Sequence, residues 1–317
     1  MADFDLEIRP FQPHDLPDVL ELLRASLGET ASLQRTPELF EWKHISNPFG
    51  RSLMLVAVDG DTIAGFRAFM RWELEQRDGA QLRCVRAVDT ATHPDYRRRG
   101  IFRQLTLAAL DAASEDGVDM VFNTPNPRSG AGYLAMGWSQ VGTIRPLASP
   151  TLAVFRHAPD TGELPDPSDF IKSPEEVGKH TFPDREARGL RTPRSAAYQE
   201  WRFTRHPTAR YTLVEAHDSG AIARMAFRGS RRELLVSELY GSRPIRALWK
   251  TRNRARSSYV GAYFSNGSPE RAALLRSGFL PVPGATMTLM ARPLRPLELD
   301  VTDLRQWDIS LGDLELL

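Results

Sequence analysis

This sequence has little cysteine and no long apolar run, two features that would indicate a disulfide-rich or a membrane protein. Cys84 is the single cysteine among 317 residues, so an internal disulfide cannot form and a reducing compartment is expected. There is no run of eighteen or more apolar residues, which excludes a transmembrane helix. The segment Met1 to Asp5 is acidic and lacks the basic and apolar regions of a signal peptide. We therefore expect a cytoplasmic protein that has no membrane partner.

The charge of the chain is almost balanced, with 41 basic and 40 acidic residues and a formal net charge of +1. Such a balance gives no broad positive field, and we expect no nucleic-acid partner. The His and Cys residues do not show the spacing of metal ligands, so no metal is expected. The length is sufficient for two domains with ordinary hydrophobic cores.

The first half of the chain alternates strand and helix patterns. Apolar alternation and turn residues predict strands over 6–11, 53–58, 63–72, 81–92 and 118–123. Helices are expected from the N-cap Asp15 to the stop signal Gly28, from Thr36-Pro37 onward, from Ile101 onward, and over 129–136.

The most informative stretch runs from Val88 to Leu105. It reads as a strand, a turn containing His93-Pro94, a loop of three arginines closed by Gly100, and then a helix. A loop of this kind directs backbone N–H groups and a helix N-terminus at one point, which suits a pyrophosphate. The arginines Arg97, Arg98 and Arg99 are placed to meet phosphates.

This segment resembles the acyl-CoA-binding motif of the GNAT N-acetyltransferase superfamily, which reads Arg or Gln, two residues, Gly, one residue, and then Gly or Ala. Arg97 and Gly100 match the motif, whereas Phe102 replaces its final small residue. The resemblance implies acetyl-CoA as cosubstrate and a backbone oxyanion donor near Ala91 or Thr92. It also implies that an Asn before the next helix holds the pantetheine arm. The cofactor-binding residues expected on this basis are Ala91, Thr92, Arg97, Arg98, Arg99, Gly100, Ile101, Phe102 and Asn126.

The second half of the chain repeats the first faintly. Arg35-Thr36-Pro37 and Glu41-Trp42-Lys43 recur in the same order as Arg191-Thr192-Pro193 and Glu200-Trp201-Arg202. Ordered internal similarity predicts tandem copies of one fold. The resemblance then implies an α/β (mixed α+β) protein with two tandem GNAT-like domains. Each would be a mostly antiparallel sheet that is splayed at a central strand and flanked by helices.

The expected division of the chain is a catalytic domain over 1–157, a linker or surface loop over 158–190, and a second domain over 191–317. In the second copy, Gly241-Ser242-Arg243-Pro244 stands where the cofactor loop would be, and it lacks the second glycine. We predict that this copy is degenerate and shapes the substrate site or supports the fold.

Acyl transfer from a thioester to an amine requires a neutral amine, an oxyanion donor and a proton for the departing thiolate. Tyr133 is the leading acid, because GNAT enzymes resemble this arrangement of an Asn, a helix bearing a Tyr, and Gly-aromatic; a packing role for Tyr133 is the alternative. Asp89 is the best candidate base or water holder, and a plain strand aspartate is about equally supported. Glu73 is a weaker choice for the base.

The favoured hypothesis is an acyl-CoA-dependent N-acyltransferase, with acetyl-CoA as donor and a primary amine of a small molecule as acceptor. Two alternatives stay open. One is a transferase of the tandem-GNAT kind that uses aminoacyl-tRNA, against which the balanced charge counts. The other is a non-catalytic CoA-sensing protein. Neither the acceptor nor the oligomeric state is defined by the sequence.

Overall fold

The computed structural model describes residues 6–29, 34–151, 187–209, 211–218, 221–229, 233–241 and 257–314. The chain forms two compact units, each assembled from separated stretches. Unit 1 comprises Met1–Leu74, Ala80–Gly142 and Thr288–Asp303, and unit 2 comprises Glu75–Gly79, Thr143–Met287 and Leu304–Leu317. Each unit is a β-sheet flanked by helices, which confirms the predicted mixed α/β class.

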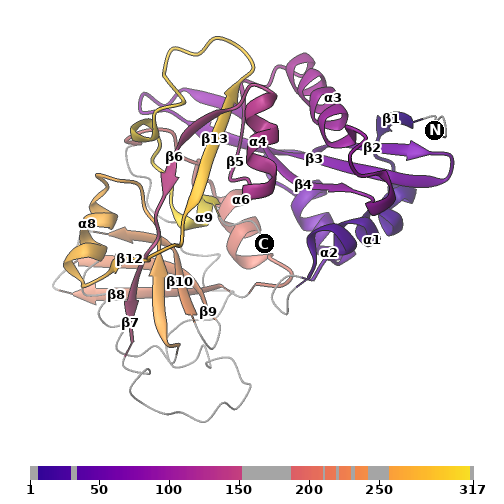
Figure 1. Ribbon diagram of the computed structural model, residues 1–317. Coiled ribbons are helices and arrows are strands. Elements are labelled where there is room, and N and C mark those ends of the chain that lie inside the picture. The colour runs from indigo at the N-terminus through magenta and orange to yellow at the C-terminus, as the bar shows by residue number, and fades with distance from the viewer. Residues whose placement is uncertain are drawn as a thin grey trace. The chain divides into compact units, whose positions relative to one another are not determined.

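The described part of unit 1 has a sheet with the strand order β1-β2-β3-β4-β5-β13-β6 (Figure 1). Strand β4 pairs with β5 in parallel, and the pairs β1/β2, β2/β3 and β5/β13 are antiparallel. The strands are β1 Leu6–Pro10, β2 Leu53–Asp59, β3 Thr62–Glu75, β4 Gln81–Thr92, β5 Met120–Asn123, β6 Ser139–Ile144 and β13 Met287–Pro293.

Helices cover both faces of this sheet (Figure 1), with α1 and α2 on one face and α3 and α4 on the other. The first pair buries Leu20 and Phe40 against Phe66, and the second buries Leu110 and Tyr133 against Phe69. The helices are α1 Leu16–Leu27, α2 Pro37–Phe40 with a π-helix over Glu41–Ile45, α3 Ile101–Glu115 and α4 Pro127–Ala135; short 3-10 turns lie at Pro13–Asp15 and Pro94–Tyr96.

Helix α1 begins and ends where the sequence predicts, but its first turn lacks the expected N-cap hydrogen bond to the Asp15 side chain. Gly28 ends the helix with a positive φ of 72°, which glycine adopts without a steric penalty. Asp15 occupies the N-cap position, yet its side chain makes no cap hydrogen bond. Instead, its carboxylate accepts hydrogen bonds from Arg9 at 2.8 Å and from the Gln12 N–H at 2.7 Å. An arginine partner thus outcompetes the helix terminus for this carboxylate.

Strands β4 and β5 pair with each other over only a short stretch. The paired residues run from Cys84 opposite Met120 to Arg86 opposite Phe122, whereas β4 continues to Thr92 and β5 ends at Asn123. The last part of β4 therefore has no register partner on β5. A sheet that opens between two parallel central strands leaves backbone groups available to a ligand that lies along the free edge. This is the splayed central strand that the sequence resemblance implied.

Within the described residues, unit 2 repeats the strand order of unit 1 from β2 onward, with the sheet β12-β7-β11-β10-β9-β8 and a parallel pair β10/β11. Its four-residue helix α6 continues into a five-residue π-helix that begins at Glu200, as the π-helix after α2 begins at Glu41. The predicted internal repeat is thereby confirmed. The elements are β7 Leu147–Pro150, α6 Ala196–Gln199, the π-helix Glu200–Thr204, β8 Tyr211–Asp218, β9 Ala221–Gly229, β10 Glu233–Gly241, β11 Tyr259–Ala262, α8 Pro269–Arg276, β12 Leu280–Pro281, a 3-10 turn Leu304–Gln306 and α9 Leu311–Leu314.

Each sheet contains one strand from the other half of the sequence. Strand β13, from the end of the second repeat, lies between β5 and β6 in unit 1. Strand β7, from the end of the first repeat, lies between β11 and β12 in unit 2. The two repeats have therefore exchanged equivalent strands.

Two sequence predictions fall largely outside the described residues. Most of the expected linker over 158–190 lies there, and so does Ser242-Arg243-Pro244 of the second copy. The degeneracy of the second copy stays a prediction.

Candidate functional site

The loop between β4 and α3 contains two residues in the left-handed backbone conformation. Arg98 and Gly100 have positive φ values of 64° and 80°, and α3 begins immediately after Gly100. The Tyr96 hydroxyl at the start of the loop donates to Asp59 at 2.8 Å, and the Arg99 guanidinium lies 5.1 Å from the Tyr96 ring centroid. These contacts hold the loop close to β2, which supplies Asp59.

The N-terminus of α3 keeps its donors for an external partner. Gly100 at the N-cap has no side chain to accept a hydrogen bond, and the first turn contains no acidic residue. The first N–H groups of a helix and its dipole favour an anion at this position. Arg97, Arg98, Arg99 and Arg103 are exposed around it. This donor set is compatible with a diphosphate, and the cofactor-binding role of these residues stays a prediction.

Phe102 in place of a small residue is accommodated by a glycine on α4. A Cβ atom at Gly132 would lie 2.9 Å from the Phe102 ring, so the ring occupies the space that the missing side chain leaves. The ring also packs edge-on against Tyr133, with centroids 5.4 Å apart. The substitution of the motif's last residue therefore closes the space between α3 and α4 without disturbing the loop backbone.

Tyr133 lies buried below this ring, with 2% of its surface exposed. Its hydroxyl oxygen accepts a hydrogen bond of 2.8 Å from Nη1 of Arg67, a fully buried residue of β3. Arginine has no acceptor to offer, so the proton of the Tyr133 hydroxyl is directed to another partner. This geometry suits a hydroxyl that donates a proton to a bound group.

Asp89 occupies a break in β4. Val85 and Ala87 face α3 and α4, and regular alternation would place Asp89 on the same face. Its positive φ of 40° interrupts the alternation, and its carboxylate instead reaches Lys43 and His44 beside α2. A non-glycine residue in this region of φ is strained and is maintained by its surroundings.

Three cationic or hydrogen-bonding groups surround the Asp89 carboxylate. Lys43 Nζ lies 2.7 Å from Oδ2, His44 Nε2 lies 2.9 Å from the same oxygen, and Arg35 Nη1 lies 3.5 Å from Oδ1. Burial would raise the pKa of Asp89, but the charge of Lys43 and the hydrogen bonds hold the pKa well below its usual range. Burial lowers the pKa of His44, whose Nδ1 is also bonded to Ser52 Oγ at 3.0 Å. Asp89 is therefore an ionised and weakly basic carboxylate.

The remaining predicted residues lie around the opening of β4. Ala91 is 5% exposed and packs with α1, and the Thr92 carbonyl accepts a hydrogen bond from Ser26 Oγ at 3.4 Å. The Asn126 side chain caps α4, since its Oδ1 accepts from the N–H groups of Arg128 and Ser129 at 3.0 Å. Ile101 is buried in the core, so only its backbone N–H faces the anion position.

Sequence reasoning missed the residues that surround the two candidate catalytic side chains. Arg67 is the lone charge in the apolar run Ile63-Ala64-Gly65-Phe66-Arg67-Ala68-Phe69, a signal that could have marked it. Lys43 and His44 are adjacent in the sequence, and Lys43 is one of only four lysines in the chain. Nothing local connects either residue to Asp89, because the contact spans more than forty positions.

Cys84 is 1% exposed on β4, and burial holds the pKa of its thiol well above the ordinary value. The thiol is therefore buried, and its reactive thiolate form is disfavoured. Within the described ranges, no three or more His, Cys, Asp or Glu side chains converge as metal ligands would. The described helices are also too short or too polar to cross a membrane.

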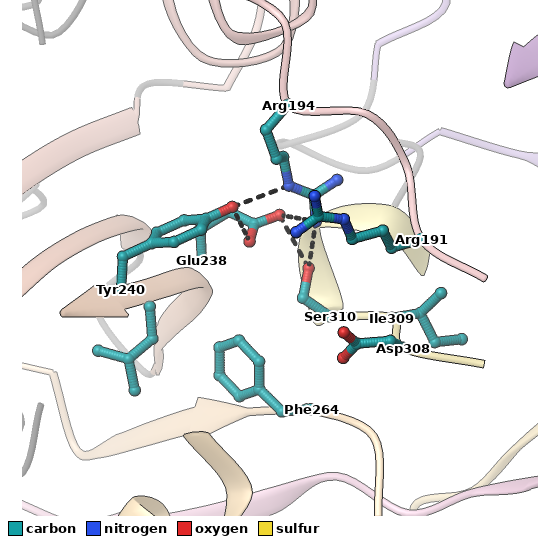
Figure 2. A pocket seen from close by; sticks show the side chains of 9 residues that line it. Arg191, Arg194, Glu238, Tyr240, Phe264, Asp308, Ile309 and Ser310 are labelled. Atoms are coloured by element: carbon teal, nitrogen blue, oxygen red, sulfur yellow. Dashed lines mark hydrogen bonds and ion pairs between the residues drawn. The ribbon is translucent and has the colours of Figure 1, made fainter. Parts of the chain in front are cut away.

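Unit 2 holds a separate cluster of buried charges at a small pocket (Figure 2). Arg194 pairs with Glu238 at 2.6 Å and with Asp313 at 2.8 Å, and its Nε donates to Tyr240 Oη at 2.9 Å. Ser310 Oγ donates to Glu238 at 2.9 Å. The polar groups satisfy one another, so we interpret the cluster as the attachment of the C-terminal segment to β10.

Comparison with known proteins agrees with this geometry. The family model of the acetyltransferase (GNAT) domain matches residues 7–141. No curated protein matches the chain.

Among solved structures, a GCN5-related N-acetyltransferase from Kribbella flavida is 16% identical with a TM-score of 0.59, over 92% of this chain and 72% of that one. A probable N-acyltransferase from Enterococcus faecalis V583 is 12% identical with a TM-score of 0.64, over 91% and 73%. A tandem GNAT protein from the clavulanic acid biosynthesis pathway is 17% identical with a TM-score of 0.54, over 93% and 100%.

Together, the family match and the solved structures indicate the class of protein that the chain resembles. Residues 7–141 match the acetyltransferase (GNAT) domain. As a whole the chain is similar in fold to a tandem GNAT protein, and its two described sheets share one strand order from β2 and β8 onward.

Proposed function

We propose that the protein transfers an acyl group from an acyl-CoA, acetyl-CoA in the simplest case, to a primary amine of a small molecule. The observation that carries this proposal is the coincidence of three features in unit 1. These are the uncapped N-terminus of α3 with its arginine loop, the opening between β4 and β5, and Tyr133, which shares a core cluster with Ala87 of β4 and Val121 of β5.

The expected roles follow from the chemistry of each group. The N–H groups of Arg98 to Phe102 and the surrounding arginines bind the diphosphate, and the free edge of β4 near Ala91 and Thr92 bonds the pantetheine amides. Asn126 supports this arm from the start of α4, where it holds the helix terminus in place. Transfer forms a C–N bond and breaks the C–S bond. The amine loses a proton to solvent water, the departing thiolate gains one from Tyr133, and Tyr133 recovers its proton from solvent.

Asp89 has a different role in this proposal from the one its sequence position predicted. A carboxylate that is kept ionised by Lys43, His44 and Arg35 is a poor proton acceptor. We propose that Asp89 positions Lys43 and His44 beside the opening of β4. Proton removal from the amine is not assigned to it.

The test is the release of free CoA thiol from acetyl-CoA in the presence of a panel of primary amines. We expect release with at least one amine and none without an acceptor. A rise in the melting temperature on addition of acetyl-CoA, without release of thiol by any amine, would favour a CoA-sensing protein instead. A response to charged tRNA alone would favour an aminoacyl transferase.

A further inference from the structure

Arg67 of β3 is an uncompensated cation in the interior of unit 1. The residue has no exposed surface, and among the described residues no carboxylate forms an ion pair with it. Guanidinium groups stay charged in proteins, and a buried charge without a partner is strongly unfavourable. A side chain of this kind is retained where a ligand supplies the missing charge or where another role offsets the penalty.

The surroundings of Arg67 supply three aromatic rings and a hydrogen-bond partner for one of its three guanidinium nitrogens. The Arg67 Cζ atom lies 4.9 Å from the Phe69 ring centroid, 5.3 Å from that of Tyr133 and 5.8 Å from that of Phe102. Nη1 donates to the Tyr133 hydroxyl. Nε and Nη2 are buried and have no hydrogen-bond partner.

The two unsatisfied nitrogens form one side of the guanidinium fork. Their N–H bonds are parallel and match the two oxygens of a carboxylate, which is the usual bidentate partner of arginine. A single thioester carbonyl oxygen would satisfy this edge less completely, because it offers one atom to two parallel donors. The edge therefore selects for a carboxylate more than for a neutral carbonyl.

The position of this edge indicates which part of a substrate it contacts. It belongs to the same guanidinium that donates to Tyr133, the proposed donor of a proton to the thiolate. A group bound there lies within a few atoms of the thioester. Of the three rings around Arg67, only Phe102 is partly exposed, and a ligand is expected to approach past this ring.

We propose that the Nε–Nη2 edge of Arg67 binds a carboxylate of the substrate, and we place that carboxylate on the acyl chain of the CoA thioester. The preferred donor is then a dicarboxylic acyl-CoA rather than acetyl-CoA. This inference rests on the proposed function, since it names the acyl group that the same site accepts.

The test compares the binding of succinyl-CoA and butyryl-CoA, which have acyl chains of four carbons with and without a carboxylate. Calorimetry of the wild-type protein should give a dissociation constant at least tenfold lower for succinyl-CoA. In Arg67→Met the two constants should become equal, while the constant for butyryl-CoA changes little. Arg67→Lys keeps the positive charge but lacks the two parallel N–H donors of the guanidinium, so it should lose most of the preference for succinyl-CoA. This variant provides the test if Arg67→Met does not fold. Arg83→Met, at an exposed arginine of β4, is the matched control and should keep the preference.

A second arm locates the carboxylate. With acetyl-CoA bound, the melting temperature is compared in glycine and in glycinamide. If glycine and glycinamide shift the melting temperature differently, if this difference depends on Arg67, and if the two thioesters bind equally, the carboxylate belongs to the acceptor. That result would overturn its placement on the acyl chain. Equal binding of the two thioesters and no difference in the second arm would overturn the whole inference but leave the proposed function intact. Failure of both thioesters to bind wild-type protein would instead refute the proposed function, and the inference with it.

Discussion

Two buried charges of unit 1 have opposite surroundings. Asp89 has Lys43, His44 and Arg35 within 3.5 Å, and its strained backbone directs it toward them. Arg67 has the rings of three aromatic residues and one hydroxyl, with an edge of its guanidinium left over. The first arrangement is complete within the protein and is expected to stabilise it. The second is incomplete and is expected to bind a ligand.

Replacing Tyr133 by Phe removes the hydroxyl that Arg67 orients. We expect a fall in kcat of at least tenfold with an active amine, because general acid catalysis of this kind contributes about 10²- to 10⁴-fold. The dissociation constant for acetyl-CoA should change less than threefold. Steady-state kinetics and calorimetry measure the two effects, and unchanged turnover in Tyr133→Phe would remove the residue from the mechanism.

Replacing Asp89 by Asn keeps a side chain that tolerates positive φ and removes only the charge. Lys43 and Arg35 then lose their anion, and we expect the free energy of unfolding to fall by about 3 kcal/mol in urea at pH 7. Because the pKa of Asp89 is lowered in the native state, this stabilisation is fully present above about pH 4 and is lost as the pH falls below it. A large loss of activity with unchanged stability would show instead that Asp89 is the base.

At the scale of single elements, the sequence predicted strands β1 to β5 of unit 1 but not the local departures from regular geometry. The predicted bounds of β4, Gln81 to Thr92, coincide with the observed ones, because turn residues flank a clear apolar alternation. The π-helices after α2 and α6 were not foreseen, since each covers only five residues, too few to show a periodicity of its own in the sequence. The orientation of Asp89 could not be predicted, because it depends on a single φ value within the strand.

The candidate site was predictable in its backbone and less so in its side chains. Gly100 and the arginines marked the loop, because glycine and phosphate-binding residues have a local signature. Arg67 lies 66 positions from Tyr133, and their contact depends on how β3 packs against α4. Such long-range contacts leave no pattern in a single sequence.

The attachment of the C-terminal segment to β10 predicts a dependence of stability on pH. Burial raises the pKa of Glu238 to about 7, despite its pairing with Arg194, because Arg194 is shared with Asp313, whose pKa is lowered. The folded state therefore holds a proton on Glu238 that the unfolded state releases at its ordinary pKa of 4.5. The stabilisation is complete below pH 4.5 and is lost as the pH rises through 7.

Glu238→Gln should remove this dependence. Between pH 5 and pH 8 we expect the free energy of unfolding of the wild-type protein to fall by on the order of 2 kcal/mol more than that of the variant. Melting curves followed by circular dichroism at a series of pH values measure the difference. Parallel pH profiles for the two proteins would contradict the assignment of a raised pKa to Glu238.

At the scale of the whole molecule, the exchange of β7 and β13 makes the two repeats dependent on each other. The first repeat alone lacks β13, which pairs with β5 from Met290 opposite Asn123 to Pro293 opposite Met120. We expect a fragment of residues 1–157 to lack cooperative melting and to recover it when residues 158–317 are co-expressed. Cooperative melting of the fragment alone, at the temperature of the full chain, would show that the exchanged strand is dispensable.

The account as a whole depends on a thioester of CoA lying in the opening of β4 with its diphosphate at the start of α3. The most direct measurement is a crystal structure of the full chain with bound CoA, supported by melting in the presence of the same ligand. We expect the diphosphate within hydrogen-bond distance of the backbone N–H groups of residues 98–102. At a concentration one hundred times the dissociation constant, we expect about 2.7 kcal/mol of added stability. A structure that shows CoA bound elsewhere, or no change in melting at saturating concentrations, would contradict the account.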